Sequence, residues 1–132
     1  MKKLTAAWMR KAESDLRVAR NLAKLRPPAH DEVCFHCQQA AEKFFKALLQ
    51  EWGHTIPRIH ELDPLLTSLS AMDATLSALS TLRPGLPELS RYAVEYRYPG
   101  FHADRRKAQA ALRMAERIRV EIRTRLGLRT KP

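Results

Sequence analysis

Residues 31–52 read DEVCFHCQQAAEKFFKALLQEW, and this stretch decides the fold. Its apolar residues return every three or four positions, which is the period of an amphipathic α-helix. Gly53 follows directly, and glycine commonly closes a helix at its C-terminus. The apolar stripe is wide, so we expect this helix to be the central one. The stripe consists of Val33, Cys37, Ala40, Ala41, Phe44, Phe45, Leu48, Leu49 and Trp52.

Two more long amphipathic segments lie on either side of this stretch. Residues 4–25 show the helical period up to Pro27-Pro28, and residues 104–126 show it with Asp104 at the N-terminal end, where a carboxylate suits the helix dipole. Between them we expect short helices from Leu62, within 72–82 and within 88–96, with a loop at 83–87. The pattern predicts an all-α fold, an up-and-down bundle of four to five helices, in a single domain over residues 1–132.

The composition narrows the class of protein. The chain has 132 residues, 45% of them hydrophobic, which fits a globular domain with its own core. No apolar run approaches the roughly 20 residues that span a bilayer, and the N-terminus lacks an apolar signal core. We therefore expect a cytoplasmic protein that does not enter a membrane. Two nearby thiols, Cys34 and Cys37, without a disulfide framework agree with that expectation.

Positive charge is concentrated in the C-terminal quarter. The net charge is +10, and residues 97–132 hold 11 Lys+Arg against 3 Asp+Glu, a net +8. Such a segment attracts polyanions, including RNA, nucleotides or an acidic protein. A solvated surface that is merely rich in arginine explains the charge equally well. Plain RNA binding through the last helix is a third hypothesis, and it predicts an affinity that falls steeply with salt.

Neither the cysteines nor the histidines form a metal-site pattern. Cys34 and Cys37 make a lone CxxC without the second pair of ligands that zinc needs, so we interpret both as small core residues. No two of the five histidines have the i, i+4 spacing of a helical metal site. The sequence therefore gives no reason to expect a metal or another cofactor.

Two groups of residues are candidates for binding or catalysis. Glu42 and Lys46 form a favourable i, i+4 pair, so this face of the central helix is either a solvated ion pair or a place where Lys43 or Lys46 meets a phosphate. Arg97 and His102 are separated by four residues: an arginine stabilises phosphoryl charge, and a histidine moves protons near neutral pH. The alternative is that Arg97 caps a helix and His102 faces solvent.

Four stretches together resemble one known family, the HEPN domains. Residues 8–16 resemble the opening motif W-x-x-x-A-x-x-D-L, and residues 34–47, CFHCQQAAEKFFKA, resemble the stretch FxxQQAAEKxxKA. His60-Glu61-Leu62 resembles the H-x-L turn, and Arg97-Tyr98-Pro99 resembles the RYP element. The matches occur in order over nearly the whole chain, and their combination is specific.

The resemblance implies a homodimer that acts beside a minimal nucleotidyltransferase, often within a toxin–antitoxin or stress system. It also implies phosphate or nucleotide binding by Lys43, Lys46, Arg97 and Tyr98. Many family members are metal-independent ribonucleases that use an Arg-x4–6-His motif across the dimer, and the matching catalytic residues here are Arg97 and His102. The residue after that arginine is usually polar in the ribonuclease branch, whereas here it is Tyr98. We therefore prefer the non-catalytic partner module and keep the dimeric endoribonuclease as the alternative.

Overall fold

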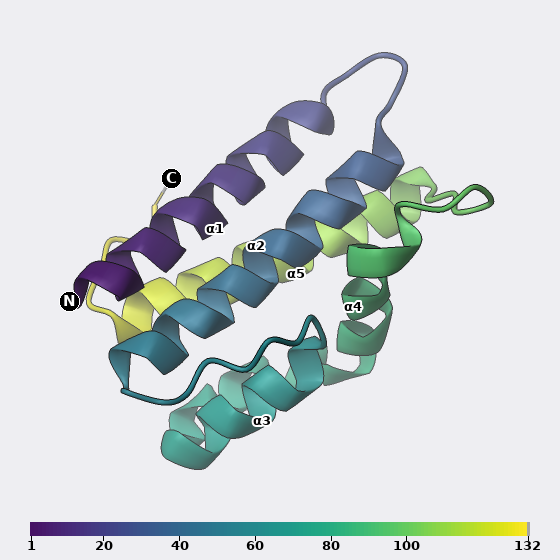
Figure 1. The fold of residues 1–132 in the computed structure, drawn as a ribbon. Coiled ribbons are helices and arrows are strands. Elements are labelled where there is room, and N and C mark those ends of the chain that lie inside the picture. Colours follow the sequence, from purple (N-terminus) through teal and green to yellow (C-terminus); the bar gives the residue numbers. More distant parts are fainter. Residues whose placement is uncertain (132) are drawn as a thin grey trace.

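The computed structural model describes residues 1–131, and within them the regular structure is entirely helical. The predicted all-α bundle of four to five helices is confirmed. No helix in this part of the chain has the combination of length and apolar character that crossing a membrane requires. In chain order the elements are α1 (Lys3–Leu22), α2 (His30–Glu51), α3 (Leu62–Met72), the 3-10 helix η1 (Ala74–Gly85), α4 (Leu86–Glu95) and α5 (Arg105–Arg125) (Figure 1).

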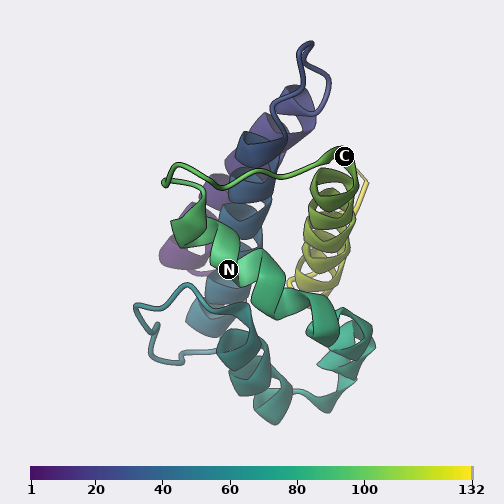
Figure 2. The same cartoon turned by 90° about the vertical axis from the view of Figure 1, so that its right-hand side faces the viewer.

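Helix α2 is the centre of the molecule, as its wide apolar stripe predicts. It packs against α1, α5, α3 and α4, and Phe44 and Phe45 on it are fully buried. Burying one such ring contributes about 1.5–3 kcal/mol, so this helix holds much of the hydrophobic stabilisation. The views in Figures 1 and 2 show α1 and α5 flanking α2, with α3 and α4 lying across the same core.

The expected loop at residues 83–87 is wrong. Arg83-Pro84-Gly85 forms the end of η1, and α4 begins at once with Leu86 and Pro87. Proline is tolerated in the first turn of a helix because no intrahelical partner is needed there for its missing N–H. Leu86 is fully buried, so packing against the core keeps this Pro- and Gly-rich stretch helical.

Both ends of α5 are fixed by side chains. At its start, Asp104 Oδ1 accepts a hydrogen bond from the Lys107 backbone N–H at 2.8 Å, which confirms the predicted N-terminal carboxylate. Near its end, buried Arg119 donates from Nε to Glu13 on α1 at 2.7 Å and from Nη1 to the Thr130 carbonyl at 2.6 Å. Arg119 therefore joins α1, α5 and the last residues of the chain.

Candidate functional site

The loop between α4 and α5 carries Arg97, Tyr98 and His102. We call residues 97–102 the RYP corner. All three side chains are exposed, Tyr98 to 62%. No side-chain hydrogen bond or ion pair among residues 1–131 involves any of the three. The corner therefore presents a cation and an imidazole that are free to meet a ligand.

The RYP corner is anchored on both sides of a tight turn. The Phe101 N–H donates to the Tyr98 carbonyl at 3.3 Å, and Gly100 has a φ of 95°, a backbone conformation that favours glycine. Proline followed by a positive-φ glycine is the sequence of a type II turn. The Phe101 ring packs edge-on against Tyr92 with centroids 5.5 Å apart, and Asp31 on α2 accepts the Ala103 N–H at 2.6 Å. His102 is thus held between two fixed residues.

A hollow of about 380 Å³, which we call the corner hollow, opens beside the turn. Its wall includes Tyr98 and His102, whereas Arg97 is not among the residues that line it. Aromatic rings stack on nucleobases and cations attract phosphates, so this lining suits a nucleotide. Its two lysine and arginine residues, Arg91 and Lys107, pair with the carboxylates of Glu95 and Glu88, so the lining has no net formal charge while His102 is neutral. The complete lining is Glu88, Arg91, Tyr92, Glu95, Tyr98, Pro99, Gly100, Phe101, His102 and Lys107.

Lys43 and Lys46 lie on α2, and each is paired with a carboxylate. The Lys43 amine donates to Asp15 on α1 at 2.5 Å. The Lys46 amine donates to Glu42 at 2.8 Å, and the Lys46 residue is only 5% exposed. The predicted Glu42–Lys46 pair is confirmed, but it is buried rather than solvated. Phosphate binding by either lysine stays a prediction, and it would require that lysine to leave its carboxylate.

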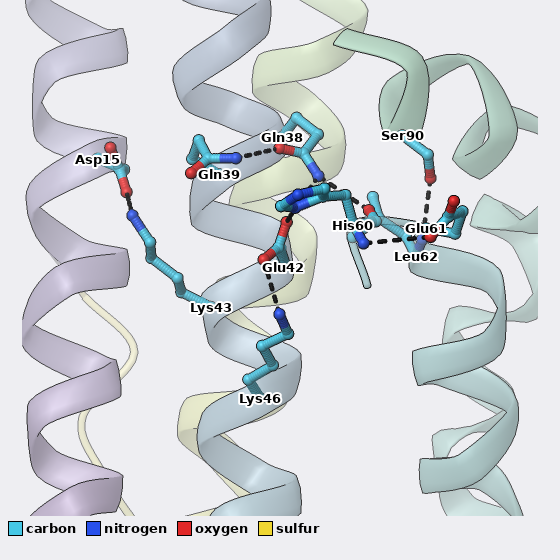
Figure 3. Close-up of polar contacts among 10 residues, drawn as sticks. All are labelled: Asp15, Gln38, Gln39, Glu42, Lys43, Lys46, His60, Glu61, Leu62 and Ser90. Atoms are coloured by element: carbon cyan, nitrogen blue, oxygen red, sulfur yellow. Dashed lines mark hydrogen bonds and ion pairs between the residues drawn. The ribbon is translucent and has the colours of Figure 1, made fainter. Parts of the chain in front are cut away.

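Glu42 is the centre of a buried polar network (Figure 3). Its Oε1 accepts from Gln38 at 3.1 Å and lies 2.9 Å from His60 Nδ1, while Oε2 accepts from Lys46. Burial alone would raise the pKa of Glu42, but the hydrogen bonds from Lys46, His60 and Gln38 outweigh it and lower the pKa below its ordinary value. Glu42 therefore stays ionised and ties α2 to the segment before α3.

A second chain of contacts leads from α1 to the RYP corner. Asp15 Oδ1 lies 2.9 Å from His36 Nδ1, on the same carboxylate that pairs with Lys43. Phe35 meets the edge of the His36 ring and stacks on Tyr96 with centroids 4.5 Å apart. Tyr96 directly precedes Arg97, so packing on α2 fixes where the corner begins. No hydrogen bond or ion pair in residues 1–131 joins the lysines to Arg97 or His102 themselves.

The family model of the HEPN domain matches residues 5–124. The chain belongs to the HEPN domain family. Comparison with curated proteins and with solved structures gives no significant match. Membership of this family supports a role connected with nucleotides or RNA.

In this HEPN domain the motif residues are mostly structural. Asp15, Gln38, Glu42, Lys43 and His60 come from three separate motifs and form the two networks just described. Of these five residues, only Glu42 and Lys43 were predicted from the helical spacing to have a role of their own. The available signal was that Asp15 and Gln38 lie beside the buried apolar face of a helix, where a polar residue indicates a polar partner, whereas His60 lies in the segment before α3 and no helical pattern marks it.

The cysteines of the HEPN domain are core residues, as expected. Cys34 and Cys37 are both fully buried and unbonded to each other. Burial, with a smaller contribution from the Asp31 charge, raises the pKa of the Cys34 thiol to about 12, so it does not form the thiolate that nucleophilic or metal chemistry needs. Within residues 1–131 no cluster of three His, Cys, Asp or Glu side chains has the geometry to hold a metal ion.

Proposed function

We propose that the protein is a non-catalytic HEPN module that dimerises and acts with a minimal nucleotidyltransferase. Its RYP corner would contact the phosphates of a nucleotide or RNA, within a toxin–antitoxin-like or stress system. The observation that carries the proposal is the contrast between two sets of cations. Arg97 is exposed and unpaired among the described residues, whereas Lys43 and Lys46 are engaged with carboxylates.

An exposed apolar strip next to the RYP corner supports dimerisation. Val94 is 51% exposed in the last turn of α4, and Tyr98 is 62% exposed in the turn that follows this helix. Val94 also lines a hollow of about 530 Å³ between α3 and α4, together with Pro64 and Pro87. A second copy seated on this strip would bury apolar surface and bring two copies of the corner together.

We expect Val94→Asp to convert the dimer into a monomer. A charge at a buried symmetric contact is placed twice in the interface, because each copy brings its own, and the two carboxylates repel. Size-exclusion chromatography with light scattering measures the mass directly. The matched control is Val120→Asp on α5, where the valine is 38% exposed and lies away from the strip; this variant should remain dimeric.

Size-exclusion chromatography also tests binding of the proposed nucleotidyltransferase partner. Mixed with a minimal nucleotidyltransferase from its own organism, the wild-type protein should elute in one complex with it. A Val94→Asp protein that keeps the wild-type mass contradicts the dimer contact. Failure of the wild-type protein to bind any such nucleotidyltransferase contradicts the partner.

A metal-independent dimeric endoribonuclease is the second candidate function. It is favoured by the presence of Arg97 and His102 at the two ends of one anchored turn, with neither side chain engaged within the described residues. Arg97 would stabilise the charge of the pentavalent phosphate, while His102 moves protons as the 2′-hydroxyl attacks. The reaction would leave RNA with 2′,3′-cyclic phosphate ends.

If this second function operates, we expect His102→Ala to abolish cleavage and EDTA to leave it unchanged. General acid–base catalysis contributes about 10²–10⁴-fold, so the loss should be plain in a gel assay of RNA fragments. His54→Ala is the control, because His54 is also exposed but lies in the loop after α2. Equal cleavage by His102→Ala and wild type excludes the mechanism, whereas intact RNA with every protein supports the non-catalytic module.

A further inference from the structure

A third hollow lies between the loop that follows α1 and the first turns of α2 and α5. Figure 1 shows these segments at the same end of the bundle. We call this hollow the basic notch. It has a volume of about 340 Å³, and its charged and titratable lining consists of Lys24, Arg26, His30 and Arg105. Leu25 and Leu112 supply apolar wall. The notch therefore combines basic groups from two separate parts of the chain, residues 24–30 and the start of α5, with a small apolar surface.

No carboxylate among residues 1–131 neutralises the positive charge of the basic notch. None of the residues that line it is acidic, and Lys24, Arg26 and Arg105 are exposed without an ion pair in residues 1–131. Asp31 follows His30 on α2 but does not line the notch, and it accepts the Ala103 N–H instead. Clustered cations that no carboxylate offsets repel one another, and an anion relieves that repulsion.

Several other arginines in this protein, in contrast, are paired with carboxylates. Arg20 pairs with Glu116 at 2.5 Å, and Arg119 and Arg123 both pair with Glu13. Carboxylates thus neutralise several arginines of α1 and α5, whereas Lys24, Arg26 and Arg105 have no ion pair within residues 1–131. Unpaired cations also occur elsewhere on the surface, but Lys24, Arg26 and Arg105 line one hollow together, which is the arrangement expected of a phosphate-binding surface.

The first turn of α5 connects the basic notch to the corner hollow. Arg105, Arg106 and Lys107 are consecutive, so their side chains leave the helix about 100° apart. Arg105 lines the notch and Lys107 lines the corner hollow. A helix with its side chains is about 10–12 Å across, so a strand of a few nucleotides can pass from one hollow to the other along these three cations, of which Lys107 has a carboxylate partner, Glu88 at 3.8 Å.

We infer that the basic notch binds a backbone phosphate of a single-stranded RNA whose neighbouring nucleotides lie at the RYP corner. This inference rests on the proposed RNA contact of that corner and extends it. The ligand chemistry is a phosphate ester, which both RNA and a free nucleotide provide. Two hollows joined by a basic turn match a polyanion with successive phosphates, whereas a single nucleotide would occupy one hollow and leave the other empty.

The test is RNA binding by a variant that lacks the notch charges. The notch variant combines Lys24→Ala, Arg26→Ala and Arg105→Ala. It should bind a fluorescent single-stranded RNA of about 12 nucleotides about tenfold more weakly than the wild type in anisotropy titrations. The plot of log affinity against log salt should flatten by about 0.7 for each phosphate that the variant no longer neutralises. All three side chains are exposed, so the circular dichroism spectrum should match that of the wild type.

The matched control removes the same charge elsewhere. This control variant combines Lys3→Ala, Arg10→Ala and Arg17→Ala. The three residues lie on α1, are exposed and have no ion pair in the described residues. Both triple variants lose three positive charges, so a general field effect would weaken RNA binding equally. We expect the control to keep its affinity within about twofold. Equal weakening by the two variants overturns the inference.

Three further outcomes identify the ligand of the notch and separate this inference from the proposed function. If the notch variant loses affinity for ATP as strongly as for RNA, the notch is a free-nucleotide site and the strand path is wrong. If an oligo-glutamate peptide binds in a notch-dependent way while RNA does not, the ligand is an acidic protein and the inference fails. If RNA binding depends on Arg97 but not on the notch, only this inference fails; if the wild type binds no RNA, the proposed contact fails with it.

Discussion

Glu42→Ala should lower the free energy of unfolding by about 3–5 kcal/mol, because it leaves the Lys46 ammonium buried without a partner. The side chains of Glu42 and Lys46 are each 7% exposed, and their charged atoms lie 2.8 Å apart. The loss is a large part of the roughly 5–15 kcal/mol that holds a domain folded. Urea denaturation followed by circular dichroism measures it.

An exposed pair with the same spacing provides the control. Glu95 pairs with Arg91 at 2.9 Å, but their side chains are 41% and 65% exposed. Glu95→Ala should cost no more than about 0.5 kcal/mol, since solvent screens an exposed helix pair. Glu42→Leu combined with Lys46→Met should recover much of the loss, because an apolar pair removes the stranded charge. Equal effects of Glu42→Ala and Glu95→Ala would contradict the buried network.

The same network predicts a pH dependence of stability. The pKa of Glu42 is lowered in the folded protein, so its contribution is present above the ordinary pKa of 4.5 and is lost as the pH falls through the folded value. Wild-type stability should therefore decline more steeply below pH 4.5 than that of Glu42→Gln, which has no carboxyl group to protonate there. Identical slopes in urea titrations would show that Glu42 is not held in its charged form.

Arg97→Ala should weaken the binding of RNA or nucleotide by about 10- to 100-fold. A hydrogen bond from a charged donor contributes about 1.5–3 kcal/mol, and each 1.4 kcal/mol is tenfold in affinity. Arg97 is exposed and makes no side-chain hydrogen bond in the described residues, so its removal should leave the free energy of unfolding unchanged. Anisotropy titration at low salt measures the affinity.

Two variants test whether the effect of Arg97→Ala on binding is specific to this side chain. Arg58→Ala removes an exposed arginine from the loop after α2 and should reduce affinity by less than about threefold, through net charge alone. Arg97→Lys keeps the charge but loses the planar fork that binds phosphate with two hydrogen bonds, so its affinity should be intermediate. If Arg58→Ala weakens binding as much as Arg97→Ala does, the contact is only a diffuse charge effect.

The long helices could be predicted because their pattern and their packing agree. The stripe on α2 that includes Phe44 and Phe45 is the buried face of the central helix, and Asp104 caps α5. The stretch around Pro84 could not be predicted, because its proline and glycine favour a loop and only the burial of Leu86 keeps it helical. There, tertiary packing outweighed local preference.

The polar site was less accessible to sequence reasoning. Lys46 and Arg119 are charged, so the sequence pattern indicates exposed residues. Each is buried because a carboxylate on another turn or another helix pairs with it, and hydrophobic periodicity does not reveal such a partner. The basic notch is assembled from the loop after α1, the start of α2 and the start of α5, so Arg105 is far in sequence from Lys24, Arg26 and His30. Arg97, Tyr98 and His102 were found because one short motif carries all three.

Photocrosslinking measures directly whether nucleic acid contacts the RYP corner, the contact on which the proposed function and the role of the basic notch both depend. RNA carrying 4-thiouridine should be bound to the protein, irradiated and digested with trypsin, and the adducts mapped by mass spectrometry. We expect the main adduct to lie in the tryptic peptide of residues 98–105, which holds Tyr98 and His102. Adducts confined to the α1 surface, with none in that peptide, would contradict this expectation.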